Sequence, residues 1–87
     1  MTHNEPESRF ETLVDGQLAI CEYRLEDDRM VFTHTYVPSQ LRGRSIAQKL
    51  VEVALKHAME TKRRVVPACS YVEAFIARRP EFQVLVG

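Results

Sequence analysis

The sequence has little cysteine, no surplus of charge of either sign and no long apolar run, and each shortage excludes a class of protein. The 87 residues include only Cys21 and Cys69, too few for a disulfide framework and not spaced as zinc ligands. We expect both to be free thiols, and we expect no metal site. Basic and acidic residues number 12 each, so the net charge of zero argues against a nucleic-acid binder.

No apolar run approaches the roughly 20 residues that cross a bilayer, and the polar residues 1–8 lack the hydrophobic region of a secretory signal. We therefore expect a cytoplasmic protein without membrane contact. Residues 1–8 read as a flexible head and residues 9–87 as one domain, since a chain of this length builds a single core. The hydrophobic share of 45% and the charged share of 28% are those of a folded soluble protein.

The first third of the sequence predicts an antiparallel β-meander. Residues 9–14 alternate polar and apolar side chains and stop at Asp15-Gly16, a dipeptide suited to a tight hairpin turn. A second strand runs through about 17–25. After a short polar turn, residues 29–37 are rich in β-branched and aromatic side chains and predict a third strand, which Pro38 ends.

The middle of the sequence predicts a helix and then a strand. From about 44 to 61 apolar residues recur at helical spacing, among them Ile46, Leu50, Val53 and Ala54. Residues 65–69 form a short apolar run of the buried-strand type, although Pro67 indicates an interruption of its pairing. A strand that follows a helix predicts a crossover into a parallel or mixed sheet.

The C-terminal residues predict a second helix and a last short strand. Ser70 and Glu73 have the spacing of a capping box at the start of a helix over 71–78. Arg79-Pro80-Glu81 breaks that helix, and residues 82–86 read as a strand. The predicted class is α/β of the α+β kind: an antiparallel β-meander followed by α-β-α-β around a mixed sheet.

The segment before the long helix has the chemistry of an anion site. Backbone amides at a helix start have no partner inside the helix, and the helix dipole adds positive charge there. Gly43 permits close approach of a phosphate, and Arg42 and Arg44 add charged donors. The alternative is a plain turn with two solvated arginines.

This segment also resembles a known family. Gln40-x-x-Gly43-x-Ser45 is similar to the Gln/Arg-x-x-Gly-x-Gly/Ala signature of GCN5-related N-acetyltransferases, whose loop amides hold the pyrophosphate of acetyl-CoA. Pro67-Ala68-Cys69-Ser70 and Pro80-Glu81-Phe82 extend the similarity to the small single-domain branch of unknown substrate, from Phe10 onward. The resemblance implies the compact fold of that family, acetyl-CoA or coenzyme A as cofactor, and the following cofactor contacts: Val37, Gln40, Leu41, Arg42, Gly43, Arg44, Ser45, Ile46, Ala47, Cys69 and Tyr71.

The sequence departs from the family pattern at several positions. Ser45 stands where the family has glycine or alanine, and its hydroxyl either adds a phosphate hydrogen bond or crowds the loop. Tyr36 stands where this branch has glutamate, so that carboxylate base is absent. Phe75 lacks the hydroxyl that many members use to protonate the CoA sulfur. Arg78 and Arg79 are candidates for the 3′-phosphate of the cofactor or for ordinary solvated charges at a helix end.

His34 is the candidate general base. By the alternation of a strand, Met30, Phe32, His34 and Tyr36 should share one face, which would place His34 between two aromatic rings just before the loop. Histidine changes charge near neutral pH and can take a proton from an ammonium group. The alternative is a histidine packed beside the core.

Cys69 is the second catalytic candidate. It lies near the start of a predicted helix, whose dipole should lower the pKa of its thiol. A thiolate could accept the acetyl group transiently, and a thiol could donate a proton to the leaving sulfur. The alternative is a small buried side chain, the role we assign to Cys21.

These features predict an acetyl-CoA-dependent acyltransferase, an N-acetyltransferase that moves an acetyl group to an amine of a small molecule or a protein. The alternative is a non-catalytic module that binds or senses coenzyme A, in keeping with the missing glutamate and tyrosine. An RNA-binding domain using Arg42 and Arg44 is disfavoured because the charge is neutral and no stacking-aromatic motif is present. We expect a monomer or a weak homodimer.

Overall fold

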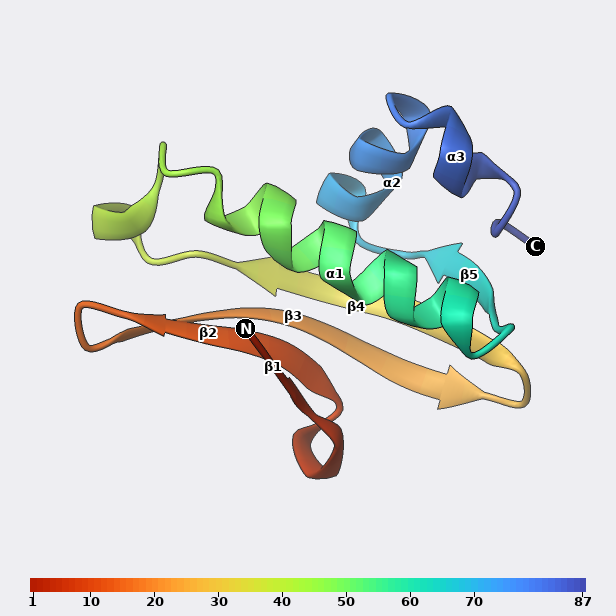
Figure 1. Ribbon diagram of the computed structural model, residues 1–87, viewed down its shortest axis with the longest axis horizontal. Helices are drawn as coiled ribbons and strands as arrows, with labels where there is room; N and C mark the ends of the chain where they lie inside the picture. The colour runs from red at the N-terminus through yellow and green to blue at the C-terminus, as the bar shows by residue number, and fades with distance from the viewer.

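The molecule is built on a five-stranded mixed sheet with the strand order β1-β2-β3-β4-β5, and three helices lie on one face of it (Figure 1). The computed structural model describes residues 1–87. The strands are β1 (Thr2–Asn4), β2 (Arg9–Val14), β3 (Gln17–Glu26), β4 (Arg29–Tyr36) and β5 (Arg64–Pro67). The helices are α1 (Ile46–Glu60), α2 (Ser70–Ala77) and α3 (Pro80–Gln83), with short 3-10 helices at Glu5–Glu7 and Ser39–Leu41.

The predicted meander and crossover are confirmed. Strands β2, β3 and β4 pair antiparallel, and Asp15 and Gly16 between the first two both have positive φ, at 51° and 75°. A two-residue hairpin needs this conformation to match the strand twist. Strand β5 pairs with β4 in parallel, with Met30 opposite Val65, after the chain has crossed the sheet through α1.

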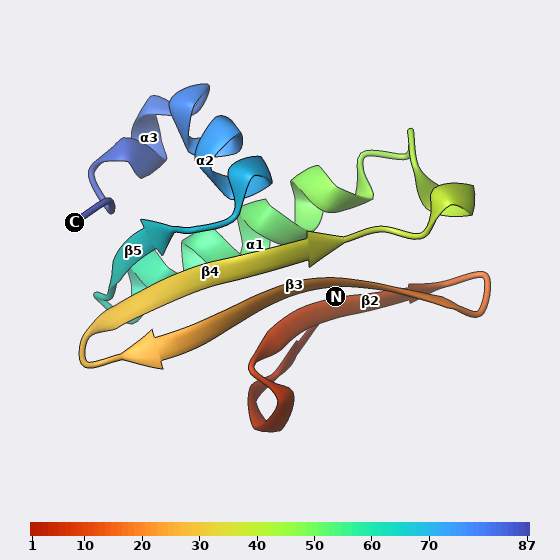
Figure 2. The ribbon, with the colours of Figure 1, turned by 180° about the vertical axis from the view of Figure 1, so that it is seen from behind.

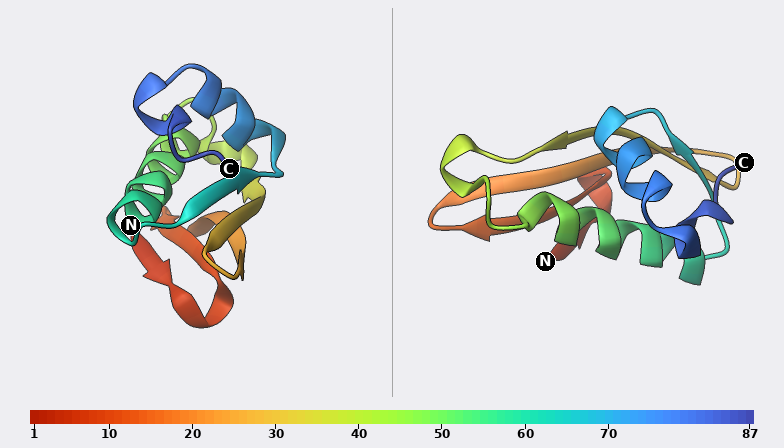
Figure 3. Two further views of the ribbon diagram at one scale, coloured as in Figure 1. Left: turned by 90° about the vertical axis from the view of Figure 1, so that its right-hand side faces the viewer. Right: turned by 90° about the horizontal axis from the view of Figure 1, so that it is seen from above.

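One hydrophobic cluster of 18 buried residues joins the sheet to all three helices. Helix α1 contributes Leu50, Val51, Ala54, Leu55 and Ala58, a stripe at helical spacing that packs on β2 to β5. Figure 3 shows α1 lying along the sheet, with α2 and α3 beside it at the β5 end. No helix of the molecule is long and apolar enough to cross a membrane.

The N-terminal residues, expected to form a flexible head, contain a strand. Thr2–Asn4 pairs antiparallel with β2, with His3 opposite Phe10. The His3 ring stacks on the Phe10 ring, with 4.1 Å between centroids, and lies 4.5 Å from the His57 ring of α1. These ring contacts come from residues far apart in the sequence, so the polar composition of this segment does not reveal them.

The C-terminal prediction needs two corrections. Helix α2 begins at Ser70 with Cys69 as its N-cap, so the Ser70–Glu73 capping box does not form and the Glu73 amide donates to the Cys69 carbonyl instead, at 3.0 Å. The predicted strand over 82–86 is wrong: Pro80 starts the helix α3, and only a single bridge between Val65 and Val86 remains of the strand. The fixed φ of proline suits a first helical turn, which favours the helix.

A β-bulge between β3 and β4 alters which face each residue occupies. Glu22 pairs with His34, but its neighbour Tyr23 pairs with Phe32, so Thr33 is an extra residue on β4. An extra residue leaves one position unpaired and reverses the alternation of side chains beyond it.

The predicted face of His34 is therefore wrong. Met30 and Phe32 point toward the helices and are buried, but Thr35 takes that side beyond the bulge, opposite the buried Cys21. His34 and Tyr36 lie on the other face and are exposed. Alternation alone predicts one face for all four residues, and the bulge cannot be read from the sequence pattern.

Candidate functional site

The loop before α1 presents a row of free backbone donors. Gly43 has φ of 87° and Ser45 has φ of 60°, so two left-handed residues flank Arg44 and reverse the chain into the helix. The amides from Gly43 to Gln48 donate no hydrogen bond within the protein, and the first helical bond runs from the Lys49 amide to the Ser45 carbonyl. Free amides at a helix start form an anion-binding site.

Except for Arg44, the residues that carry these amides line a cavity of about 330 Å³, whose lining is Val37, Leu41, Arg42, Gly43, Ser45, Ile46, Ala47, Gln48 and Tyr71. All but Gln48 were predicted to contact cofactor. Arg42 is held in place because its Nε donates to the Val37 carbonyl, at 3.2 Å, which ties the loop to the end of β4. Arg44 faces away and pairs with Asp15, at 3.0 Å, and Gln40 is exposed outside the cavity.

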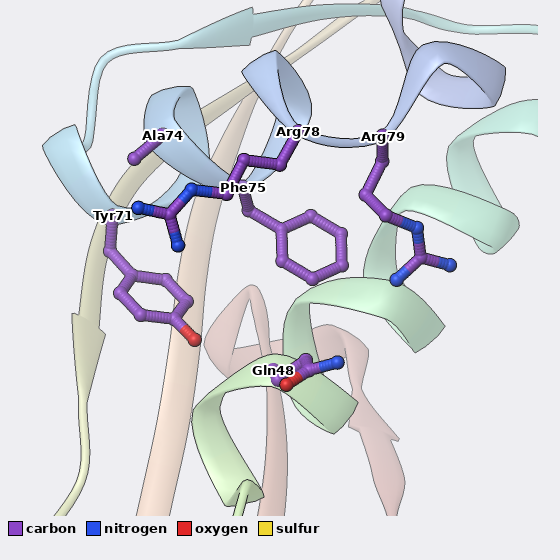
Figure 4. A pocket seen from close by; sticks show the side chains of 6 residues that line it. All are labelled: Gln48, Tyr71, Ala74, Phe75, Arg78 and Arg79. Atoms are coloured by element: carbon purple, nitrogen blue, oxygen red, sulfur yellow. The ribbon is translucent and has the colours of Figure 1, made fainter.

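A second cavity, of about 200 Å³, adjoins the first through Gln48 and Tyr71 and lies between α1 and α2 (Figure 4). Its other lining residues are Ala74, Phe75, Arg78 and Arg79. The two arginines differ in their contacts. Arg79 pairs with Glu52 of α1, at 2.6 Å, and with Glu81, at 3.0 Å, whereas Arg78 has no ion pair. Arg78 is therefore the cation that remains available in this cavity.

Cys69 lies at the junction between β5 and α2, where β4 and β5 separate. Its amide donates to the Phe32 carbonyl, at 2.8 Å, and its Sγ lies 3.6 Å from the Thr35 hydroxyl. It forms no side-chain cap hydrogen bond. Partial burial raises the pKa of the Cys69 thiol, but the nearby amides of Val72 and Tyr71 and the Thr35 hydroxyl outweigh it, so the net pKa is lowered. The lowered pKa of Cys69 is the direction that the sequence predicts.

Cys21 has the opposite environment. It is fully buried among the core residues of β3, and burial raises its pKa to about 12, against a smaller lowering by the Thr35 hydroxyl at 3.9 Å. A thiol of this kind stays protonated and packs as a small apolar side chain. Thr35, which stands between the two sulfurs, is a site residue that the sequence pattern missed, because only the bulge turns it toward Cys69.

Strand pairing leaves an open edge beside these groups. The pairing of β4 with β5 ends at Phe32 and Pro67, so β4 from Thr33 to Tyr36 has no neighbour on that side. Thr35 faces Cys69 on the helix side of this edge, and His34 lies on the opposite side. The two catalytic candidates are therefore on different sides of the sheet, at the same open edge.

Comparisons of the sequence with known proteins show the family of the chain. The sequence model of a family described as GCN5-related N-acetyl-transferase matches residues 9–85. The chain belongs to the GCN5-related N-acetyltransferase family. Protein NATD1 of Bos taurus is 31% identical over 86 residues, which are 95% of this chain and 76% of the relative, and NATD1 of Mus musculus is 29% identical over 86 residues, 95% of this chain and 78% of the relative.

The fold of the GCN5-related family is also evident in a solved structure. The solution NMR structure of a GCN5-like candidate N-acetyltransferase from Staphylococcus aureus superposes with a TM-score of 0.76, covering 93% of this chain and 82% of that one at 24% identity. The compact mixed-sheet fold expected from the resemblance is therefore confirmed.

Two side chains depart from what the resemblance to GCN5-related enzymes implied. Tyr36 occupies the position expected for a carboxylate and lies on the exposed face, with its ring stacked on His34 at 6.5 Å between centroids. Phe75 lines the second cavity under the Arg79 guanidinium, which lies 5.1 Å from its ring centroid. The carboxylate expected at position 36 and the hydroxyl expected at position 75 are therefore both missing.

Proposed function

We propose that this member of the family is an acetyl-CoA-dependent N-acetyltransferase that moves an acetyl group to an amine. The observation that carries the proposal is the run of unpaired amides from Gly43 to Gln48, in residues that, except for Arg44, line the 330 Å³ cavity. Unpaired amides and the positive end of a helix dipole match the charge of a pyrophosphate. The NATD1 relatives and the family model support the same class.

The residues present fit coenzyme A. The cavity volume lies in the range of about 300–1,000 Å³ typical of cofactor pockets. At Gly43 an added Cβ would meet no protein atom within 4 Å, so the space beside the loop is open to a ligand, and the positive φ of this position favours glycine. Arg42 would stand beside the pyrophosphate, and Arg78 in the adjoining cavity would take the 3′-phosphate. Ser45 keeps its amide free while adopting the left-handed conformation.

Acetyl-CoA supplies the activated acetyl group, and the residues at the open edge of β4 supply proton transfer. Cys69, with its lowered pKa, is suited either to accept the acetyl group as a thiolate or to donate a proton to the departing sulfur. Thr35 positions the Cys69 sulfur. His34, on the other side of the edge, takes a proton from the acceptor ammonium.

Binding and transfer are tested separately. Acetyl-CoA should raise the melting temperature of the protein. An unchanged melting temperature at millimolar acetyl-CoA would contradict the proposal. With a suitable amine, free CoA thiol should be released above background. Intact mass spectrometry should show an acetyl adduct that Cys69→Ser removes if Cys69 is an intermediate. Unmodified protein after long incubation would assign Cys69 to proton donation or packing.

The 3′-phosphate contact has its own test. Wild-type protein should bind coenzyme A more tightly than dephospho-coenzyme A, and Arg78→Ala should abolish that preference by lowering affinity for coenzyme A alone. Arg29→Ala, which removes an exposed arginine at the start of β4, is the matched control and should keep the preference. An unchanged preference in Arg78→Ala would exclude Arg78 from the contact.

A non-catalytic module that binds coenzyme A is the second candidate. The absence of a carboxylate at Tyr36 and of a hydroxyl at Phe75 favours it, because both groups serve proton transfer rather than binding. Such a module would show the melting shift and the Arg78 dependence, yet would release no CoA thiol with any amine in a broad panel.

A further inference from the structure

The face of the sheet that the helices leave bare carries a polar row across three strands. Arg9 of β2 pairs with Glu22 of β3, which pairs in turn with His34 of β4. Residues directly opposite each other in an antiparallel pair share a face, with Cβ atoms about 5 Å apart. The bulge at Thr33 is what brings His34 to this face. Figure 2 shows β2, β3 and β4 from this side, with α1 behind them.

The Glu22 carboxylate is a charged group of this row that has no partner. Arg9 gives its Nη2 to Glu11, at 3.6 Å, and the Glu22 carboxylate has neither an ion pair nor a hydrogen bond within the protein. The side-chain hydrogen bond that reaches Glu22 ends on its backbone carbonyl and comes from the Thr33 hydroxyl, at 3.5 Å. A half-buried carboxylate without a partner, beside an imidazole, is suited to bind a cation.

An apolar strip continues from this pair along the same face. The strip consists of Leu13, Leu18, Ile20 and Tyr36, with Leu13 opposite Leu18 and Ile20 opposite Tyr36. Leu13 is 69% exposed and Tyr36 is 47% exposed, so the strip is open to solvent. Adjoining apolar side chains exposed on one face are typical of a binding surface.

The order of these groups matches one kind of acceptor. Ile20 and Tyr36 lie two residues along their strands from Glu22 and His34, which is about 7 Å. A lysine side chain has the same order, an apolar four-carbon stem that ends in an ammonium. Both principal cavities lie on the helix side, so neither of them encloses an acceptor on this face, and an exposed sheet face suits a polypeptide surface.

We propose that this face binds the acceptor as a lysine of a polypeptide, with its stem on Ile20 and Tyr36 and its ammonium between Glu22 and His34. The inference rests on the proposed transferase function. Glu22 holds the ammonium, and His34 takes one proton from it and passes that proton to solvent. The neutral nitrogen then bonds to the acetyl carbon as the carbon–sulfur bond of the thioester breaks. The nitrogen loses its second proton to solvent, and the departing thiolate takes a proton from solvent, directly or through Cys69.

The test compares Glu22→Gln with Glu26→Gln, which removes the same charge from the same strand near its far end. The probe is a peptide with blocked termini and one lysine between leucine and isoleucine. A second peptide with serine on both sides of the lysine tests the apolar contacts. Butylamine is the small-molecule acceptor for comparison. Transfer is followed by CoA thiol release and peptide mass, acetyl-CoA binding by calorimetry, and peptide contacts by amide NMR shifts. Tyr36→Ser probes the strip with an exposed residue that the core does not need.

Glu22→Gln should lower kcat/KM for the lysine peptide about tenfold or more, mostly through KM, while acetyl-CoA affinity stays unchanged and Glu26→Gln behaves as wild type. Tyr36→Ser and the serine-flanked peptide should each lose activity, and amide shifts should centre on Leu18, Ile20 and Glu22. Equal kcat/KM in Glu22→Gln, or butylamine used as well as the peptide, overturns the inference. So does acetyl-CoA binding without peptide turnover. Failure of the wild type to bind acetyl-CoA counts instead against the proposed function.

Discussion

Cys21 and Cys69 both lie beside the Thr35 hydroxyl, yet their thiols are shifted in opposite directions. Burial in the core dominates at Cys21 and raises its pKa to about 12. At Cys69 burial also raises the pKa, but the amides at the start of α2 and the Thr35 hydroxyl more than offset it. The surroundings therefore disfavour the thiolate of Cys21 and favour that of Cys69.

We predict that iodoacetamide modifies Cys69 alone in the folded protein near neutral pH. Cys69→Ser should remove the modification. Thr35→Val removes a hydroxyl that stabilises the thiolate, so the pH profile of modification should move to higher pH and the neutral rate should fall severalfold. The measurement is mass spectrometry over a pH series. Equal modification of Cys21 and Cys69 would contradict this reading of their surroundings.

At the residue scale the sequence supplies candidate side chains for the chemistry, but it does not indicate the face of the sheet to which each one points. The position of Cys69 before a helix predicts the direction of its pKa shift. The face of His34 and the role of Thr35 were not predictable, because one extra residue at Thr33 reverses the alternation of the strand. Such a bulge depends on the pairing partner and has no local signature here.

The loop before α1 is the element on which the proposed binding depends. Gly43 and Ser45 both adopt the left-handed conformation, and substitutions at these two positions should have opposite effects on stability and binding. Gly43→Ala forces a Cβ into φ of 87° and should lower the free energy of unfolding by about 1 kcal/mol and weaken acetyl-CoA binding. Ser45→Gly relieves the same strain at φ of 60° and should retain or increase both. Chemical denaturation and calorimetry measure these changes, and equal stabilities of the two variants would refute the assignment.

Strand β1 is an element whose stability should depend on pH. Burial, followed by the charge of His57, lowers the pKa of His3, with a further lowering by Arg63 and an opposing effect of Glu5. The folded protein therefore favours the neutral His3 ring, which also hydrogen-bonds with the Tyr23 hydroxyl. This stabilisation is present above the unfolded-state pKa of about 6.5 and is lost as the pH falls through the lower folded value.

Hydrogen exchange should accordingly show β1 amides losing protection below about pH 6 while the α1 core remains protected. His3→Gln keeps a polar side chain without the titration and should flatten this dependence. Protection of β1 that stays constant between pH 7 and pH 5 in the wild type would contradict the assignment.

Elements with a strong periodic pattern are the ones that the sequence predicts. Strands β2 to β4, α1 and the parallel β5 follow from hydrophobic periodicity, since each buries one face in the common core. The short elements differ from their prediction. Helix α3 forms in place of the predicted strand because Pro80 favours a helix start. Strand β1 is held by contacts of the His3 ring with the rings of Phe10 and His57, which lie outside its own segment.

At the scale of the whole molecule, the sheet separates two kinds of surface. The helix side holds both principal cavities, the free amides and Arg78, and the bare side holds Glu22, His34 and the apolar strip. The open edge of β4 is where the sides meet. The motif from Gln40 to Ser45 indicates the residues on the cavity side, because they are consecutive in the sequence. The bare side is assembled by register across three strands, which no linear motif records.

The central claim is that the amides from Gly43 to Gln48 bind the pyrophosphate of acetyl-CoA. An amide NMR titration of the 87-residue protein with acetyl-CoA tests it most directly, because each donor is observed separately. We predict that the largest saturable shifts fall on these amides and on Tyr71, with smaller ones at Arg78. Shifts confined to other parts of the molecule, or none at millimolar acetyl-CoA, would contradict the account.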